Sequence, residues 1–492
     1  MRRLSAAALP RLPAGVARPA YDRAEATPGI VHLGVGAFHR AHQAVMTDDA
    51  LAAGDSGWGI VAASLRSPDT RDALAPQDGL YTLATRAPEG ERLRVVGAIR
   101  EVLVAHESPA MLIAAMADPR VRIVSLTVTE KGYCHDPATG ELNEAHPDIV
   151  HDLAHPEAPR SAPGFLVAAL ARRRQAGAAP FTILCCDNLP ANGRTVKQVV
   201  GRLAALRDRD LGAWVAGEVA CPSTMVDRIV PATTDEDRAR VSAALGVADA
   251  WPVVTEPFIQ WVIEDDFSAG RPRWEVAGAE FVADVAPHEL MKLRMLNGAH
   301  STLAYLGFLA GHETVADAAN DPLFARLLEG FWTEAAPSLP AAPGLDPAAY
   351  ARRLLARFQN TSIRHRLAQI AMDGSQKLPQ RLLGTIRENL AAGRPIAHLA
   401  LGVAAFALHA SGVDEKGGPI EVRDPLAPAL AERLGDVRRN PEAAARRLME
   451  MRPIFGADLA ADPAFAVALA AAVGELARRG ARGAVEALAG PV

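Results

Sequence analysis

The sequence predicts an α/β N-terminal half built on a mainly parallel sheet, followed by a predominantly helical C-terminal half. At 492 residues the chain exceeds the size of one ordinary hydrophobic core, so two large domains are expected. In the first half, short apolar runs alternate with amphipathic segments, as they do in parallel α/β sheets. From about Pro287, long amphipathic segments rich in alanine and leucine dominate. We therefore place the two domains at residues 1–286 and 287–492.

Composition and charge exclude several classes of protein. A hydrophobic fraction of 49% with 22% charged residues is typical of a soluble globular chain. The net charge of −5 gives no reason to expect nucleic acid or an anionic membrane as partner, and no apolar run is long enough to span a bilayer. The four cysteines fit no metal-binding spacing, and the adjacent pair Cys185 and Cys186 indicates buried thiols of a reducing compartment.

The first 21 residues contain no acid and several arginines, which weakly resembles a transit peptide. Prolines at positions 10, 13 and 19 interrupt any amphipathic helix there. We interpret this stretch as an N-terminal arm and expect a cytoplasmic protein.

A glycine turn follows the first expected strand, residues 29–33, and precedes an expected helix over 41–53 and a second strand over 58–65. Strand, glycine turn, helix and strand open a dinucleotide-binding unit. In such a unit Gly34 permits the tight turn, and Gly36 lets backbone amides approach a pyrophosphate. His39 replaces the third glycine, and we expect Arg40 to offer its charge to the phosphates. The candidate cofactor-binding residues here are Gly34, Gly36, Ala37, Phe38, His39 and Arg40.

Further strands are expected at 93–99, 121–128 and 181–186, with helices over 108–116 and 164–174 and a short strand at 253–254. Two of these strands end in polar turns, which contain Thr129 and Asn188. Because ligands of open α/β sheets bind beyond the carboxyl ends of strands, both turns are candidate walls of a site. The alternative is ordinary loop chemistry, since Asn, Pro and Gly are common turn residues.

The stretch 291–300 concentrates side chains of catalytic type. It is expected to be helical, because its residues tolerate helix and no proline interrupts it. At about 100° per residue, His300 lies about 80° and Asn297 about 140° from Lys292 around the axis. Glu289 lies about 60° from the lysine, on the same side. An amine, an amide, an imidazole and a carboxylate would thus share one apolar face; the alternative is that each is satisfied locally.

Five blocks occur in order along the chain: residues 34–43, 127–133, 186–193 and 223–231, and a Lys-x4-Asn-x2-His pattern that begins at Lys292. Together they resemble the polyol-specific long-chain dehydrogenases, the mannitol dehydrogenase family, which also includes fructuronate and tagaturonate reductases. The resemblance covers most of the chain. It implies an NAD-dependent, metal-free oxidoreductase of sugar alcohols and ketoses, with an expanded Rossmann domain that binds the dinucleotide and a helical domain that carries the substrate and catalytic groups.

The resemblance also implies roles for individual residues. General acid–base catalysis falls to Lys292, binding of the carbonyl oxygen to Asn188 and Asn297, binding of a substrate oxygen to His300, and a proton route to Glu289. These roles agree with the chemistry, because oxidation of a secondary alcohol removes a proton while hydride leaves the same carbon. A buried lysine suits this task, since burial can lower the pKa of an amine by up to roughly 3–5. Paired amide donors stabilise developing alkoxide charge.

The choice of nicotinamide depends on the turn after the second strand, on the order of 20 residues beyond the glycine turn. Arg66 and Ser67 suit the 2′-phosphate of NADP, whereas Asp69 suits the 2′-hydroxyl of NAD. Because the resembled family favours NAD, we expect NAD, with NADP as the alternative.

The substrate prediction rests on residues 369–381, which resemble fructuronate reductases (mannonate oxidoreductases) more than mannitol 2-dehydrogenases. Many mannitol-active members have an arginine where this chain has Gln369. Arginine and lysine are the usual partners of a carboxylate, and several lie nearby, although they also suit surface ion pairs. The candidate substrate-binding residues are Arg364, Lys377, Arg381 and, from the block at 223–231, Asp227. Asp227 alternatively orients the catalytic helix or forms a structural ion pair.

The sequence therefore predicts reduction of D-fructuronate to D-mannonate without a metal. Two alternatives remain: a mannitol or arabinitol 2-dehydrogenase, and a non-catalytic NAD-binding regulator. The expected partner is a small sugar acid or polyol, and the expected state is a monomer or a small homo-oligomer.

Overall fold

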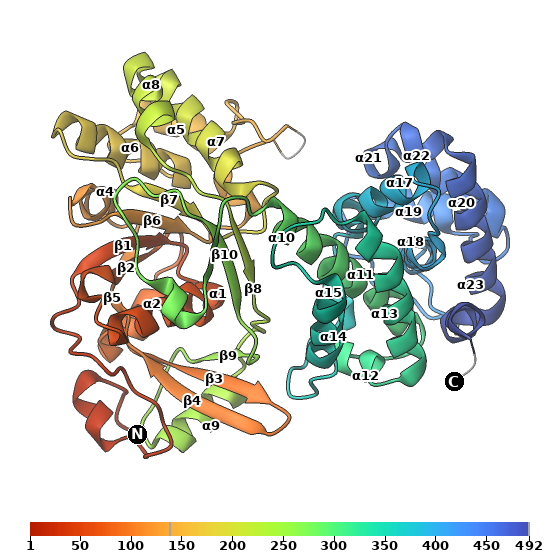
Figure 1. The fold of residues 1–492 in the computed structure, drawn as a ribbon, viewed down its shortest axis with the longest axis horizontal. Coiled ribbons are helices and arrows are strands. Elements are labelled where there is room, and N and C mark those ends of the chain that lie inside the picture. Colours follow the sequence, from red (N-terminus) through yellow and green to blue (C-terminus); the bar gives the residue numbers. More distant parts are fainter. Residues whose placement is uncertain (137–138, 491–492) are drawn as a thin grey trace. The chain divides into compact units, whose positions relative to one another are not determined.

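The computed structural model describes residues 1–136 and 139–490. The chain divides into two compact units, Met1–Ala286 and Pro287–Val492 (Figure 1). Each unit is built differently, and each is described by itself.

A five-stranded sheet forms the centre of the first unit. Its strand order is β5-β2-β1-β6-β7, and all four pairings are parallel. The order reverses between β1 and β6, which is the topological switch point where α/β proteins bind dinucleotides. The predicted α/β fold class with a Rossmann-type sheet is therefore confirmed. The strands are β1 (Pro28–Leu33), β2 (Gly59–Ser64), β5 (Ile99–Val104), β6 (Ile123–Leu126) and β7 (Thr182–Cys185).

Alternation along the strands sends side chains to two buried faces. Val31 and Leu33 pack in one core with residues of α4, α6 and α7, whereas Ile30 packs in a second core with residues of α1 and α2 (Figure 1). Because both faces are covered, the strands are buried almost throughout. The bounds are α1 (Ala37–Ala41), α2 (Gln43–Ala52), α4 (Pro109–Ala117), α6 (Ala162–Gln175) and α7 (Asn192–Arg207).

Two smaller three-stranded sheets, ordered β11-β10-β8 and β4-β3-β9, complete the first unit. Their strands are β3 (Tyr81–Ala87), β4 (Gly90–Val96), β8 (Thr224–Asp227), β9 (Val253–Thr255), β10 (Gln260–Glu264) and β11 (Glu280–Val282). The remaining helices of this unit are α3 (Asp69–Leu74), α5 (Pro147–Ala154), α8 (Arg209–Glu218) and α9 (Asp235–Leu245).

Two sequence predictions about this unit were wrong in detail. The strand expected at 93–99 is divided, because β4 ends at Val96 in an antiparallel pair with β3 and the parallel strand β5 begins only at Ile99. The chain turns at Gly97, whose amide donates to Asp48 Oδ1 at 2.8 Å. The helix expected over 41–53 is interrupted at His42, which has φ −121° and ψ −93°.

The second unit is helical, as predicted. Its central helices α11 and α18 are buried almost all round and pack against each other, and α18 also packs against the long helix α23 (Figure 1). The helices are α10 (Ala286–Met291), α11 (Gly298–Leu309), α12 (Val315–Ala319), α13 (Pro322–Ala335), α14 (Pro347–Phe358), α15 (Leu367–Ile370), α16 (Gly374–Leu378), α17 (Gly384–Ala391), α18 (Ala397–Ala410), α19 (Ala427–Leu434), α20 (Pro441–Met449), α21 (Arg452–Phe455), α22 (Asp458–Ala461) and α23 (Pro463–Ala489).

The turn after β1 passes very close to the end of β6. Gly34 has φ +94°, and a Cβ at this position would lie 2.1 Å from the carbonyl oxygen of Thr127. The Gly34 amide donates to Ala63 O at 2.8 Å, so the glycine is also fastened to β2. Only glycine satisfies both the left-handed backbone and the close approach.

We predict that Gly34→Ala destabilises the first unit by about 2–5 kcal/mol, because it adds a steric clash to the cost of positive φ. Gly54→Ala is the matched control: Gly54 has φ +100°, and the atom nearest to a Cβ at that position would lie 4.0 Å away. The control should lose only about 1–2 kcal/mol. Urea denaturation measures both, and equal losses would refute the importance of the close approach.

Candidate active site

A buried histidine fastens the glycine turn to the sheet. His32 Nδ1 lies 2.8 Å from Ser125 Oγ, and its Nε2 lies 2.9 Å from Thr127 Oγ1. The Thr127 hydroxyl also lies 2.7 Å from the carbonyl oxygen of Gly34. Burial lowers the pKa of His32 to about 3, so the ring is neutral at physiological pH. Sequence reasoning found no partner for His32, because its partners stand more than 90 residues away on β6 and just beyond it.

The side chains of His39 and Arg40 point into the interior of the first unit. The His39 ring is fully buried and stacks on His32, with ring centroids 3.4 Å apart. The Arg40 guanidinium donates to the carbonyl oxygen of Trp251 and lies 5.3 Å from the ring centroid of Tyr81. The prediction that Arg40 offers its charge to phosphates was therefore wrong, and the His39 ring likewise serves the core. Position in the glycine motif did not reveal which face of α1 is buried.

The other residues of the glycine turn suit a dinucleotide better. Gly36 is exposed and extended, and a Cβ there would meet nothing closer than 3.9 Å, so open space borders its backbone. Ala37 and Phe38 begin α1 and are half-buried, with Phe38 stacked on His42. The helix α1 is only five residues long, so its dipole is weaker than the sequence suggested.

Arg66 and Asp69 lie where the cofactor-selecting residues were expected, in and after the turn that follows β2. Both are exposed, and Asp69 is the first residue of α3. Its amide donates to Ser67 Oγ at 3.1 Å, which shapes the turn between them. A cation and a carboxylate are thus both accessible at this edge of the sheet.

Asp187 joins the two polar turns that were expected to wall the site. Its carboxylate accepts hydrogen bonds from the amides of Val128 at 2.9 Å and Thr129 at 3.1 Å, and from the Tyr133 hydroxyl at 2.6 Å. Burial raises the pKa of Asp187 despite these donors. Thr129 has φ +65°, a strained conformation for a β-branched residue. The next residue after the aspartate, Asn188, is exposed at the same carboxyl edge of the sheet.

Asp227 is the last residue of β8, and its side chain is buried. The neighbouring turn after β7 is tied to β8 by Asn192, whose Nδ2 donates to Thr224 O at 2.9 Å while its Oδ1 accepts from the Thr224 amide at 2.9 Å. The first unit therefore holds the turn that carries Asn188 and the strand that carries Asp227 in a fixed relation.

In the second unit, Lys292 opens a π-helical turn, Lys292–Asn297, between α10 and α11. The expected regular α-helix, and its rotation of 100° per residue, therefore do not hold here, because a π-turn bonds i to i+5. Lys292 is 8% exposed, Glu289 in α10 and Asn297 are half-buried, and His300 is buried. Such turns cost hydrogen-bond geometry and occur often at functional sites.

Side chains and a backbone carbonyl from neighbouring segments stabilise this π-turn. The Trp332 indole donates to the carbonyl oxygen of Met295 at 2.9 Å. The Arg294 guanidinium donates to Glu388 and, at 2.6 Å, to the carbonyl oxygen of Ser338. Both bonds occupy polar groups that an unsupported turn would leave unpaired.

A second π-turn, Pro379–Leu383, packs against the first. Gly298 permits this approach, since a Cβ there would lie 2.9 Å from the carbonyl oxygen of Arg381. The guanidinium of Arg381 donates to Ser301 Oγ at 3.1 Å. The packing thus places a predicted substrate-binding arginine beside α11, the helix that contains His300.

The ring of His300 contacts two other rings. It stacks on Phe358, with centroids 4.4 Å apart and planes at 18°, and it meets His365 edge to face at 5.4 Å and 85°. Within the described residues, Nε2 of His300 is buried without a hydrogen-bond partner. Buried polar atoms normally have a hydrogen-bond partner, and a substrate oxygen would supply one here.

The charges of several cationic side chains act on His300. Its pKa is held well below the usual value, first by burial, then by His365 and by the charges of Arg381, Arg357 and Lys292. The imidazole is therefore neutral near pH 7. Sequence reasoning missed Arg357 and His365, because both belong to elements some 60 residues beyond His300 and no local pattern singles them out.

The other predicted cations have hydrogen-bond or ion-pair partners of their own. The ammonium group of Lys377 donates hydrogen bonds to the carbonyl oxygens of Ile370 and Met372. Arg364 is 70% exposed and forms an ion pair with Glu313, and Arg366 lies near the same carboxylate. Arg364 therefore forms the surface ion pair that was the alternative interpretation, and the structure does not bring it to the His300 cluster.

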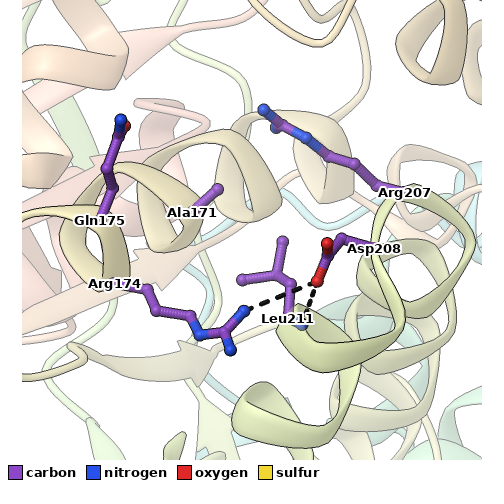
Figure 2. Close-up of a pocket in the computed structure, with 6 residues that line it drawn as sticks. All are labelled: Ala171, Arg174, Gln175, Arg207, Asp208 and Leu211. Atoms are coloured by element: carbon purple, nitrogen blue, oxygen red, sulfur yellow. Dashed lines mark hydrogen bonds and ion pairs between the residues drawn. The ribbon is translucent and has the colours of Figure 1, made fainter.

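A hollow in the first unit lies away from these residues. It has a volume of about 450 Å³ and lies where α6 meets α7 and α8, and Figure 2 shows Arg174 pointing across it toward Asp208. The two are 3.6 Å apart, so the polar lining of this hollow is already ion-paired. None of the predicted site residues lines it.

One cluster in the described chain has metal-ligand chemistry, although no such site was predicted. Cys134, His146 and Asp148 bring their ligand atoms within 4.8 Å of one another. The His146 ring, however, accepts a hydrogen bond from the Asp148 amide at 3.2 Å and thereby caps α5, and burial raises the pKa of Cys134 to about 12. These observations fit a helix cap beside a protonated thiol.

Among the described residues, no helix combines the length and apolar character needed to cross a bilayer.

Both halves of the chain match known protein families. Residues 28–276 match the mannitol dehydrogenase Rossmann domain, and residues 284–477 match the mannitol dehydrogenase C-terminal domain. The chain is 48% identical to the uncharacterized oxidoreductase YeiQ of Escherichia coli (strain K12), over 96% of each chain. It is 47% identical to D-mannonate oxidoreductase of the same organism, over 96% of this chain and 98% of the relative. Mannitol 2-dehydrogenase of Pseudomonas fluorescens, solved as a ternary complex with NAD and D-mannitol, is 41% identical with a TM-score of 0.88 over 99% of each chain.

We predict that His39→Phe weakens the acid sensitivity of the first unit. Burial holds the pKa of His39 well below 6.5, so below that pH the unfolded chain takes up a proton that the folded chain refuses. For each such histidine, the free energy of unfolding falls by up to about 1.4 kcal/mol for every pH unit below pH 6.5. Above pH 6.5 the histidine has no such effect.

Phenylalanine keeps the stack on His32, so the variant should lose stability between pH 6.5 and pH 5 by about 1 kcal/mol less per pH unit than the wild type. Urea denaturation at several pH values measures this slope. His106→Gln, at an exposed histidine, is the control and should keep the wild-type slope. A wild-type slope in His39→Phe would contradict the burial argument.

Proposed function

Because the chain belongs to the mannitol dehydrogenase family, an oxidoreductase family with members that act on CH–OH groups, we propose that it reduces D-fructuronate to D-mannonate with NADH. The relatives named as oxidoreductases favour an enzyme over a non-catalytic NAD-binding regulator. The similarity to D-mannonate oxidoreductase over nearly the whole chain supports the acidic substrate.

The gathering of cations around His300 carries the substrate proposal. Arg381, Arg357 and Lys292 all act on the same buried imidazole. Positive charge at a partly desolvated site favours an anion, and arginine binds carboxylates through paired hydrogen bonds. A keto-uronate carries a terminal carboxylate that a ketose lacks.

The first unit fits the dinucleotide. The switch point between β1 and β6, the close turn at Gly34 and the open space beside Gly36 together suit a pyrophosphate. A bound nicotinamide supplies the hydride for reduction of the carbonyl carbon. Gly34, Gly36, Ala37, Phe38 and Thr129 are the proposed contacts, with Arg66 and Asp69 at the ribose. NAD, as in the Pseudomonas complex, is the proposed form, with NADP as the alternative.

The second unit supplies the proton. In reduction the Nζ of Lys292 donates a proton to the developing alkoxide, and in oxidation it accepts that proton back. Glu289, which precedes the lysine in α10, passes the proton to water. The amide of Asn297 donates a hydrogen bond to the oxygen as its charge develops, and loss of one such donor typically costs about 10²–10³ in rate. Asn188, in the first unit, is the other proposed amide donor to the carbonyl oxygen.

Three further residues orient the substrate. Neutral His300 offers its unpaired ring nitrogen to a substrate oxygen. Arg381 and Lys377 bind the terminal carboxylate of the substrate, and Asp227 binds one of its hydroxyl groups. Arg364 is left out of this proposal because its ion pair with Glu313 lies on the surface.

A second candidate is a mannitol or arabinitol 2-dehydrogenase. The solved Pseudomonas relative, whose structure contains D-mannitol, favours it because its fold and length match this chain. The catalytic steps would be the same, and only the residues at the far end of the substrate would differ.

We predict that Lys292→Ala lowers kcat by about 10²–10⁴ while it leaves the affinity for NADH within about threefold. The lysine moves the proton, whereas the cofactor contacts lie in the first unit. Lys416→Ala, at an exposed lysine of the second unit, is the control and should keep full activity. Turnover of Lys292→Ala within tenfold of the wild type would exclude the lysine as acid–base catalyst.

We also predict that kcat/KM is at least about tenfold higher for D-fructuronate than for D-fructose, the size of one charge-assisted hydrogen bond. The KM for the uronate should rise with salt, because screening weakens attraction between a carboxylate and a cationic pocket. The KM for fructose should not change. Measurement of NADH oxidation between roughly 50 and 500 mM salt tests both points, and a preference for fructose would instead support the polyol dehydrogenase.

A further inference from the structure

We propose that His365 determines specificity for the acidic substrate, by donating a hydrogen bond to the substrate carboxylate beside His300. This inference rests on the proposed function and deepens it. It assigns to a residue outside the recognised sequence blocks the discrimination between a keto-uronate and an uncharged ketose.

The first support is the fixed position of His365. Its carbonyl oxygen accepts a hydrogen bond from the amide of Val315 at 2.9 Å, and its own amide donates to Ile363 O at 3.0 Å. A bridge between Thr314 and Arg366 extends this pairing. The segment between α14 and α15 is therefore fastened to the start of α12, so the imidazole is presented by a backbone that is held on both sides.

The second support is the position of the ring beside the proposed substrate contact. The rings of His365 and His300 lie against each other with centroids 5.4 Å apart and planes at nearly a right angle. Phe358 stacks on His300. A substrate oxygen bound to His300 is thus close to the ring of His365, which of these two neighbouring rings is the one that can form a hydrogen bond.

The third support is an unpaired polar atom. Nδ1 of His365 is buried and has no hydrogen-bond partner within the described residues. Burial also lowers the pKa of His365, which keeps the ring neutral with one N–H to donate. In the tautomer that carries its proton on Nδ1, this nitrogen is an unpaired buried donor, which an acceptor bound there satisfies.

The surrounding charge selects the kind of acceptor. Arg381 and Arg357 belong to the set of charges that act on the adjacent His300, together with Lys292. A carboxylate has about four lone-pair sites, so it accepts from an arginine fork and from an imidazole at the same time. The terminal hydroxymethyl group of a ketose has one oxygen and no charge, and it leaves such a site incompletely paired.

The test uses His365→Phe in the full-length protein. Phenylalanine keeps an aromatic edge against His300 but has no N–H to donate. We expect kcat/KM for D-fructuronate to fall by about 10- to 100-fold, the usual effect of losing a hydrogen bond to a charged group. The value for D-fructose should stay within about threefold of the wild type. The loss should appear mainly in KM, since the reacting carbon and Lys292 are untouched.

His312→Phe is the matched control. His312 is also half-buried in the second unit and also meets an aromatic ring edge to face, that of Phe324 at 5.0 Å and 82°, but it is not among the groups that act on His300. This variant should leave the ratio of the two kcat/KM values unchanged.

The outcomes separate this inference from the proposed function. A wild-type enzyme that reduces fructuronate, with the same substrate ratio in His365→Phe, would overturn the role of His365 alone. An equal fall for both substrates would also overturn it, because His365 would then only support His300. A wild-type enzyme without activity on fructuronate would overturn the proposed substrate and this inference together.

Discussion

The contact between Gly34 and the carbonyl of Thr127 is the constraint on which the nucleotide end of the first unit depends. It brings the turn after β1 against the end of β6 at the point where the strand order reverses. The hydroxyl of Thr127 and the buried ring of His32 hold this contact by hydrogen bonds, and Asp187 extends the connection to β7. The carboxyl ends of three strands thereby form one rigid edge, as a dinucleotide site requires.

In the second unit, several charged and polar side chains are buried away from water. Lys292, Arg294 and His300 are all buried. The guanidinium of Arg294 donates hydrogen bonds to Glu388 and to a backbone carbonyl, and these bonds stabilise the π-turn. Lys292 and His300 belong to the proposed chemistry. In this stretch the structural cation and the residues proposed for catalysis are therefore different side chains.

Several parts of this arrangement were predictable. The five parallel strands follow from short apolar runs separated by amphipathic segments, and the boundaries of the helical half follow local chemistry, for example Pro322 as the first residue of α13 and Gly393 with φ +65° after α17. Other parts were not. The division of residues 93–99 between two sheets depends on a contact of Gly97 with Asp48, and the burial of Arg40 depends on Trp251 and Tyr81. Those partners are distant in sequence.

The sequence by itself determined the fold class, the family and the residue types of the proposed chemistry, because these depend on local periodicity and on ordered motifs. Only the tertiary structure decided that Lys292–Asn297 form a π-turn, that Arg364 forms a surface ion pair, and that His365 lies against His300. The physical reason is that burial, pKa and pairing arise from neighbours brought together by packing. No spacing along the chain specifies which of several arginines becomes buried near a given imidazole.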